Sequence, residues 1–200
     1  MCINRKYIKK IGIKPSTLFE KDSYLLDLPM VQFLYQNNTL SFNKPVTFFV
    51  GENGTGKSTI LEAIAVSYGF NPEGGTRNFN FHTSETHSEL YKSIYVSKEA
   101  YPKDGFFFRA ESFYNTASYI DEIGASHNYG DRSLHEQSHG ESFLSLIQNR
   151  FSGNGLYLLD EPEAALSPSK LLTLLVCINN LVKLNSQFII ATHSPILMTY

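Results

Sequence analysis

The sequence predicts an α/β fold with a mostly parallel β-sheet flanked by helices. Two apolar runs, Gly155–Asp160 and Gln187–His193, are typical of buried strands, and a helical segment from Ser167 to Leu184 lies between them. The order strand, helix, strand favours parallel pairing in one sheet. A third strand, Val46–Val50, precedes a glycine-rich turn and the helical run Ile60–Ala65.

The glycine-rich turn is a phosphate-binding loop, with the sequence Gly-Glu-Asn-Gly-Thr-Gly-Lys-Ser at residues 51–58. Its glycines adopt conformations that other residues avoid and let polyphosphate approach the backbone closely. Backbone N–H groups and the helix N-terminus then receive the anionic phosphates, and Lys57 reaches the β- and γ-phosphates. We therefore expect a nucleoside triphosphate as ligand, contacted by Glu52, Asn53, Gly54, Thr55, Gly56, Lys57, Ser58 and Thr59.

The strand Leu156–Asp160 ends in two adjacent carboxylates, Asp160 and Glu161, which have the form of a Walker B motif. We expect Asp160 to hold Mg²⁺ together with the Ser58 hydroxyl, and Glu161 to act as the general base on the attacking water. An acidic strand end that merely faces solvent is the alternative. The phosphate-binding loop upstream argues against it, and the sequence thus predicts Mg²⁺-dependent ATP hydrolysis.

Several short motifs together resemble the ATP-binding cassette class of ATPases, and the resemblance covers nearly the whole chain. Ser138–Ser142, Ser-His-Gly-Glu-Ser, falls where that family has its signature, a short distance before Walker B. Ala165–Pro168 resembles the D-loop, and His193 resembles the switch histidine at the end of the next strand. Glu111 falls where the family usually has a glutamine that senses Mg²⁺ and the attacking water.

The resemblance implies an ATP-dependent homodimer in which two nucleotides are held head to tail. Ser138, Gly140 and Glu141 of one copy would contact the nucleotide bound by the other copy. Physically this is reasonable, since donors at a helix N-terminus stabilise anionic charge. By the same resemblance His193 is catalytic, because it stabilises the γ-phosphate or orients the water, and Glu111 joins the metal site.

The signature departs from the commoner Leu-Ser-Gly-Gly-Gln form. This departure points to the soluble, AAA and SMC-like branch of the family, which includes ATPases of recombination repair, chromosome structure and phage defence. Two alternatives stay open: a nucleotide-binding subunit of a membrane transporter, and an ATP-gated DNA- or RNA-binding module. The interval between Gly51 and Ser138 is too short for the long coiled coil of chromosome-structure ATPases.

We expect residues 1–200 to form a single domain, with an N-terminal antiparallel β subdomain and a small inserted subdomain at about residues 70–150 that includes the signature. Tyr24–Leu28 and Val31–Tyr35 read as antiparallel strands, and Phe106–Glu111 as a further strand. Residues 69–105 are polar and glycine-rich and read as a mobile excursion. The family normally continues beyond Tyr200, which leaves a C-terminally incomplete domain as an open alternative.

Composition places the chain among ordinary globular proteins, with 42% hydrophobic and 18% charged residues. The net charge of -2 gives no global positive field that would indicate nucleic acid or an anionic membrane as partner. The only cysteines, Cys2 and Cys177, suit a reducing compartment, so we expect a cytoplasmic protein. No apolar run is long enough for direct membrane insertion.

Two competing patterns point to other functions. His135–His139 matches the His-Glu-x-x-His pattern of zinc peptidases, but Gly140 follows at once and no third ligand is evident. The aromatic run Phe106–Phe108 could stack on single-stranded nucleic acid, although core packing explains it better because only Arg109 is interleaved. The remaining candidate ligands, His82, His87 and His127, read as solvated loop residues.

Overall fold

The computed structural model describes residues 6–15, 23–77, 88–122, 124 and 138–200. Its centre is a four-stranded parallel sheet in the order β3-β7-β6-β5. The strands are β3 (Val46–Val50), β5 (Asp104–Arg109), β6 (Gly155–Asp160) and β7 (Gln187–Thr192). This arrangement confirms the predicted fold class: a parallel sheet flanked by helices, accompanied by an antiparallel sheet.

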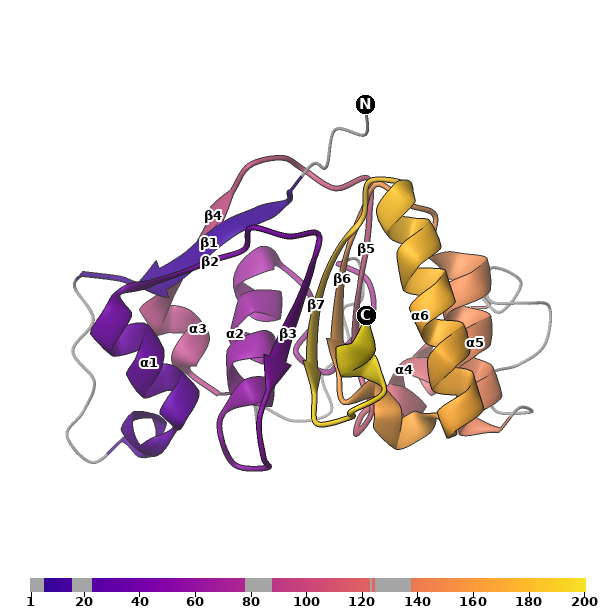
Figure 1. The fold of residues 1–200 in the computed structure, drawn as a ribbon, viewed down its shortest axis with the longest axis horizontal. Helices are drawn as coiled ribbons and strands as arrows, with labels where there is room; N and C mark the ends of the chain where they lie inside the picture. The colour runs from indigo at the N-terminus through magenta and orange to yellow at the C-terminus, as the bar shows by residue number, and fades with distance from the viewer. Residues whose placement is uncertain (1–5, 16–22, 78–87, 123, 125–137) are drawn as a thin grey trace.

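Helices cover both faces of the parallel sheet, as Figure 1 shows, with α2 on one side and α5 and α6 on the other. Alternate side chains of β6 enter two different cores: Leu156 and Leu158 pack with α2, whereas Tyr157 and Leu159 pack with the opposite helices. This period of two is the normal consequence of strand geometry. A central strand buried on both faces accounts for the unbroken apolar run in the sequence.

The helical elements complete the two layers. The α-helices are α1 (Pro29–Asn37), α2 (Lys57–Tyr68), α3 (Leu90–Ser93), α4 (Phe113–Glu122), α5 (His139–Arg150) and α6 (Pro168–Lys183). Short 3-10 turns are η1 (Tyr24–Asp27), η4 (Pro162–Ala165) and η5 (Leu197–Thr199). Within the described ranges, every helix is too short or too polar to cross a lipid bilayer.

A second, antiparallel sheet has the order β2-β1-β4, formed by β1 (Ile8–Ile13), β2 (Thr39–Ser41) and β4 (Ile94–Lys98). The side chain of Gln187, at the start of β7, joins the two sheets. Its Oε1 accepts hydrogen bonds from the backbone N–H groups of Tyr7 at 2.7 Å and Ile8 at 2.9 Å. Its Nε2 donates to the Ile8 carbonyl at 2.9 Å. A fully buried amide with these partners fixes the antiparallel sheet against the parallel sheet.

The prediction of strands at Tyr24–Leu28 and Val31–Tyr35 was wrong, because these residues form η1 and α1. Pro29 occupies the first helical turn, where its missing N–H has no cost. Val31 and Leu34, three residues apart, are the buried side chains of α1, which is helical spacing. The strands of the antiparallel sheet come from other parts of the chain.

Within residues 69–105, the described part contains a helix and a strand that were not predicted. Leu90–Lys98 forms α3 and β4, and β4 pairs with β1 along most of its length. The strand was missed because Ile94 and Val96 face the core through a short segment whose flanks are polar. Residues 78–87, with His82 and His87, lie outside the described part of the chain.

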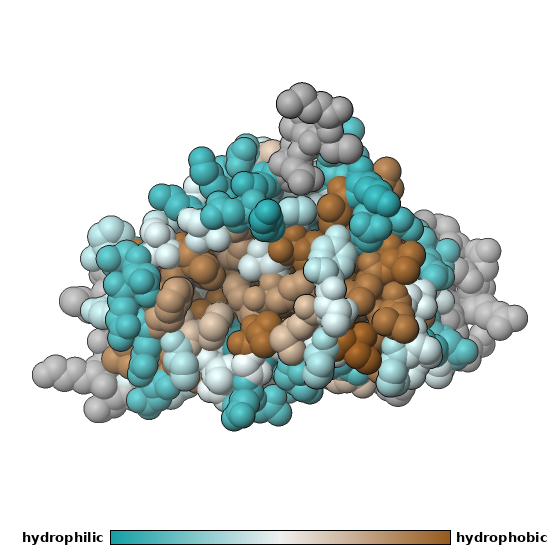
Figure 2. Space-filling model, viewed as in Figure 1, coloured by the Kyte–Doolittle hydropathy of each residue, from teal (hydrophilic) through white to brown (hydrophobic). Residues whose placement is uncertain are grey.

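The helix predicted from Ser167 to Leu184 is present as α6, with Ser167 as its N-cap. Only one stripe is buried, whereas Leu172 is 57% and Val176 is 59% exposed. In Figure 2 hydrophobic surface is visible over the part of the molecule where α6 lies.

A buried ion pair anchors the end of the sheet away from the phosphate-binding loop. Asp104 begins β5, and its carboxylate accepts hydrogen bonds from Arg150 at 2.7 Å and from the Tyr157 hydroxyl at 2.8 Å. The Ser152 N–H and hydroxyl add two more, at 3.1 and 3.2 Å. Burial by itself raises the pKa of Asp104, but Arg150 and these hydrogen bonds outweigh it and hold the pKa below its ordinary value.

We predict that Asp104→Asn lowers the free energy of unfolding at pH 7 by about 3 kcal/mol, because Arg150 then lacks its buried counter-charge. The lowered pKa means that the stabilisation by ionised Asp104 is present above the unfolded value, about 4, and is lost as the pH falls through the folded value. The variant should therefore lose part of the acid sensitivity of wild type. Urea denaturation from pH 3 to 7 measures both effects. Asp27→Asn, at an exposed position in η1, is the matched control; equal stability changes for the two variants would contradict the prediction.

Candidate nucleotide site

The phosphate-binding loop lies between β3 and α2 and is shaped by glycines. Gly54 and Gly56 have left-handed backbone conformations, with φ of 81° and 89°. Gly56 is also the N-cap of α2. A Cβ added at Gly56 would lie only 3.1 Å from the Cβ of Leu28. The loop therefore leads directly into the first turn of α2, which begins at Lys57. The free N–H groups of that turn are suited to bind an anion.

Lys57 points back into the loop instead of toward solvent. Its Nζ donates to the carbonyls of Gly51 and Glu52, both at 2.8 Å, and only 3% of the residue is exposed. The Thr55 hydroxyl closes the same turn by donating to the Glu52 carbonyl at 2.8 Å. The Lys57 ammonium group is thus held beside the backbone of the loop, where it would attract phosphate oxygens.

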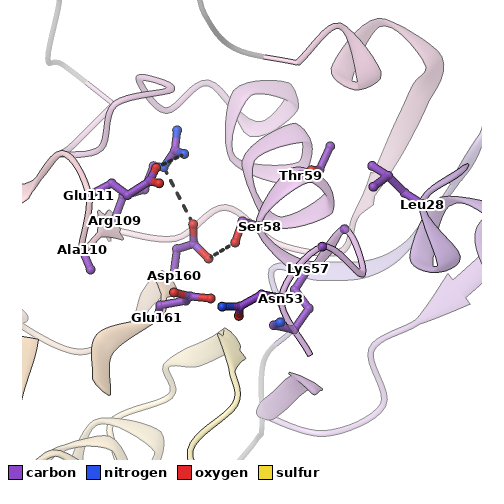
Figure 3. A pocket seen from close by; sticks show the side chains of 12 residues that line it. Leu28, Asn53, Lys57, Ser58, Thr59, Arg109, Ala110, Glu111, Asp160 and Glu161 are labelled. Atoms are coloured by element: carbon purple, nitrogen blue, oxygen red, sulfur yellow. Dashed lines mark hydrogen bonds and ion pairs between the residues drawn. The ribbon is translucent and has the colours of Figure 1, made fainter. Parts of the chain in front are cut away.

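Ser58 and Asp160, which are 102 positions apart in the sequence, meet in the structure: the Ser58 hydroxyl donates to Asp160 Oδ1 at 2.8 Å. Asp160 is the last residue of β6 and is almost completely buried. Burial raises the pKa of Asp160 to about 6, although the Ser58 hydrogen bond and Arg109 oppose this. Figure 3 shows both side chains at the foot of the loop. A hydroxyl and a carboxylate are the hard oxygen ligands that Mg²⁺ prefers, so these residues fit the ion.

Arg109 is a site residue that sequence reasoning did not assign. It ends β5, beside Asp160 at the end of β6. Its guanidinium contacts Glu62 at 2.8 Å, Glu111 at 3.2 Å and Asp160 at 3.8 Å, so it lies among three carboxylates. Figure 3 shows it opposite Ser58 across the Asp160 carboxylate. The sequence does contain a signal for Arg109, because this charged residue ends an apolar strand in the same way that Asp160 ends β6.

Glu161 has a left-handed backbone conformation with φ of 47°, which is uncommon for a residue other than glycine. The conformation is held by a hydrogen bond from its N–H to the Ala191 carbonyl at 3.0 Å. The Glu161 side chain is 32% exposed, in contrast to its neighbour Asp160. Figure 3 shows its carboxylate pointing toward Asn53 of the loop. The two adjacent acids therefore occupy different environments.

A cavity of about 370 Å³ connects these groups, which is a volume in the range of small-molecule sites. Of the predicted site residues, those that line it are Asn53, Gly54, Gly56, Lys57, Ser58, Thr59, Glu111, Asp160 and Glu161. Leu28, Arg109 and Ala110 complete the lining and were not predicted. Leu28 comes from the segment that was wrongly predicted as a strand, so its approach to the loop could not be foreseen.

The predicted signature residues lie elsewhere in the chain and do not line this cavity. Ser138 is the exposed N-cap of α5, and the Glu141 carboxylate accepts hydrogen bonds from the Ser138 N–H at 3.0 Å and hydroxyl at 2.6 Å. These hydrogen bonds and Lys170 lower the pKa of Glu141. Gly140 is packed so closely that a Cβ there would lie 2.8 Å from the Ala165 carbonyl oxygen. The contact of these residues with nucleotide stays a prediction.

His193 follows β7 directly and lies beside two carboxylates, with Nδ1 3.2 Å from Glu163 and 3.8 Å from Glu161. Glu163 was not singled out from the sequence. It lies two residues beyond Glu161 in η4, and only the folded chain brings it to the end of β7.

The structure does not test the zinc alternative; among the described residues alone, no group of three or more His, Cys, Asp and Glu side chains is arranged to hold a metal ion. Residues 135–137, which belong to the His-Glu-x-x-His pattern, lie outside the described part of the chain, as does His127.

Comparison with known proteins identifies the family of the chain. A family model described as an AAA domain matches residues 31–148, more than half of the chain. A second, described as "AAA domain, putative AbiEii toxin, Type IV TA system", matches residues 127–199. The phosphate-binding loop, the Walker B strand and the parallel sheet define the class of P-loop ATPases. The chain belongs to the AAA-domain family within that class.

Two solved structures are similar in arrangement. One is the SMC head domain from Thermotoga maritima, with 18% identity and a TM-score of 0.48, covering 97% of this chain and 92% of that chain. The other is an ATP-binding cassette of an ABC transporter, with 17% identity and a TM-score of 0.35, covering 96% of this chain and 84% of that chain. No curated protein matches the chain at a significant level.

We predict that Asp160→Asn stabilises the nucleotide-free protein at pH 7.5, by up to about 3 kcal/mol. The pKa of Asp160 is raised to about 6, so the folded state has to hold a buried negative charge above that pH. Below about pH 4 the carboxyl is protonated in both states and the gain should vanish. Thermal unfolding across this pH range measures it. If the variant is less stable than wild type at pH 7.5, the ionised Asp160 carboxylate does not destabilise the folded state, and the prediction is wrong.

Proposed function

We propose that the protein is a Mg²⁺-dependent ATPase that closes as a head-to-tail dimer around ATP and reopens when ATP is hydrolysed. The observation that carries the proposal is the hydrogen bond between Ser58 and Asp160, at 2.8 Å, at the floor of the loop cavity. It places a hydroxyl and a buried carboxylate beside the helix N-terminus and Lys57, where a triphosphate and its metal ion would be bound.

Each residue has a role that follows from its surroundings. Lys57 and the loop N–H groups bind the phosphates, while Ser58 and Asp160 hold Mg²⁺. When bound, Mg²⁺ would neutralise charge that develops on the phosphate oxygens. The Asp160 carboxylate is buried and would be bound to Mg²⁺, so it is a poor base for a water molecule. Glu161 is more exposed, lines the same cavity and is the better general base.

The dimer is supported by the separation of the signature from the cavity. Ser138 is exposed at the N-terminus of α5, and neither it nor Gly140 lines the site of its own chain. A second copy would have to bring its signature to the open side of the cavity. The donors at the N-terminus of α5 would then face the γ-phosphate.

The decisive variant is Glu161→Gln, which keeps the shape of the side chain but removes the base. We predict that it binds ATP as wild type does, that its kcat falls about 100-fold or more, and that it accumulates as an ATP-bound dimer. Phosphate release measures turnover, and sedimentation velocity with Mg²⁺ and ATP measures assembly.

Two controls sharpen this experiment. Lys57→Ala should abolish nucleotide binding and hence dimerisation, while Glu122→Gln, at an exposed position on α4, should behave as wild type. If Glu161→Gln turns over ATP at the wild-type rate, Glu161 is not the base. If it stays monomeric with saturating ATP, the head-to-tail dimer is wrong. Repeating the sedimentation with duplex DNA tests the nucleic-acid alternative. Binding through phosphate contacts should weaken when the salt concentration is raised.

A further inference from the structure

We propose that Glu163 is a positioning residue for His193: its carboxylate fixes the tautomer and orientation of the imidazole ring. The consequence for ATP hydrolysis rests on the proposed function, whereas the pairing of the two side chains can be tested without it. Nothing in the sequence motifs assigns this residue a role, and the inference comes from its contacts.

The Glu163 side chain lies at the carboxyl end of the parallel sheet and is only 8% exposed. One oxygen, Oε1, accepts hydrogen bonds from the Thr192 hydroxyl and from the His193 N–H, each at 2.7 Å. The same Oε1 lies 3.2 Å from Nδ1 of His193. Glu163 therefore contacts both the backbone and the ring of His193.

The surroundings of the imidazole decide which nitrogen carries the proton. Nδ1 faces two carboxylates, Glu163 at 3.2 Å and Glu161 at 3.8 Å. Carboxylates accept hydrogen bonds and do not donate them, so the neutral ring is stabilised with its proton on Nδ1. Nε2 is then the nitrogen that remains for the nucleotide or the attacking water.

A purely structural cap would not require a carboxylate here. The second oxygen of Glu163, Oε2, is buried and has no hydrogen-bond partner among the described residues. Burying a charged group with an unsatisfied oxygen costs free energy, and an amide would accept the two hydrogen bonds from Thr192 and the His193 backbone at lower cost. The negative charge of Glu163 is explained if the carboxylate orients the imidazole ring of His193.

The local backbone holds Glu163 in this place. Glu161 has the left-handed conformation, and Pro162 then opens the short turn η4, in which Glu163 lies. The Ala164 N–H donates back to the Glu161 carbonyl at 3.0 Å. The general base and the positioning residue thus lie on one short turn, on either side of a proline, and both carboxylates lie within 4 Å of Nδ1 of His193.

The first test is the tautomer of His193, measured by long-range ¹H–¹⁵N correlation on the full chain without nucleotide, at a pH where imidazoles are neutral. The spectrum of His193→Gln identifies the signal. We expect wild type to show the Nδ1–H form and Glu163→Gln to shift toward the Nε2–H form, because a neutral amide is a weaker acceptor. An Nε2–H ring in wild type, or an unchanged tautomer in Glu163→Gln, would overturn the proposal.

Thr192→Val is the matched control, since it removes a hydrogen bond to the same Glu163 oxygen but keeps the carboxylate beside Nδ1. It should leave the tautomer as in wild type. If Glu163→Gln and Thr192→Val change the His193 signal equally, the effect is loss of packing and not of charge, and Glu163 has only a structural role.

The second test is kinetic. Glu163→Gln should lower kcat about tenfold or more with little change in the KM for ATP, because it acts on a group needed only in the transition state. In the His193→Ala background the same change should cost nothing further. An equal loss in both backgrounds would contradict the proposal. Absence of ATPase activity in wild type would refute the proposed function instead, and the tautomer experiment would still decide the pairing of Glu163 with His193.

Discussion

The site depends on one costly feature, the buried carboxylate of Asp160 at the end of β6. Its charge is opposed by burial and is sustained by the Ser58 hydroxyl and the nearby Arg109. An acid in this state is poised for a cation, because a divalent ion would remove the penalty of holding it ionised. The phosphate-binding loop and the strand end are therefore coupled through electrostatics as well as through packing.

The parallel order of the sheet explains why the acting groups gather at one edge. β5, β6 and β7 are neighbours in the sheet, and their carboxyl ends carry Arg109, Asp160 with Glu161, and His193 respectively. Ligands of open α/β sheets generally bind at that edge. The turn after β6 adds Glu163, which joins the chemistry of β6 to the end of β7. The same turn ends at Ala165, against which Gly140 of α5 is packed.

Part of the fold and of the site could be predicted from the chemistry of residues that are neighbours in the sequence. The phosphate-binding loop, the strands β6 and β7 and the helix α6 are encoded by neighbouring residues, and each lies where it was expected. Predictions failed where distant contacts decide the outcome. Val31–Tyr35 resembles a strand until Val31 and Leu34 are seen to pack on one helical face. Glu163 has no motif of its own, because its role depends on β7 lying next to β6.

The most direct test of a metal-bound triphosphate at this edge is a crystal structure with Mg²⁺ and a non-hydrolysable ATP analogue. The account predicts the triphosphate wrapped by the loop N–H groups, with the ion about 2.1 Å from the Ser58 hydroxyl and on the Asp160 side of it. The direct hydrogen bond between Ser58 and Asp160 should then be replaced by the ion. A structure in which that hydrogen bond persists while the triphosphate binds elsewhere would contradict the account.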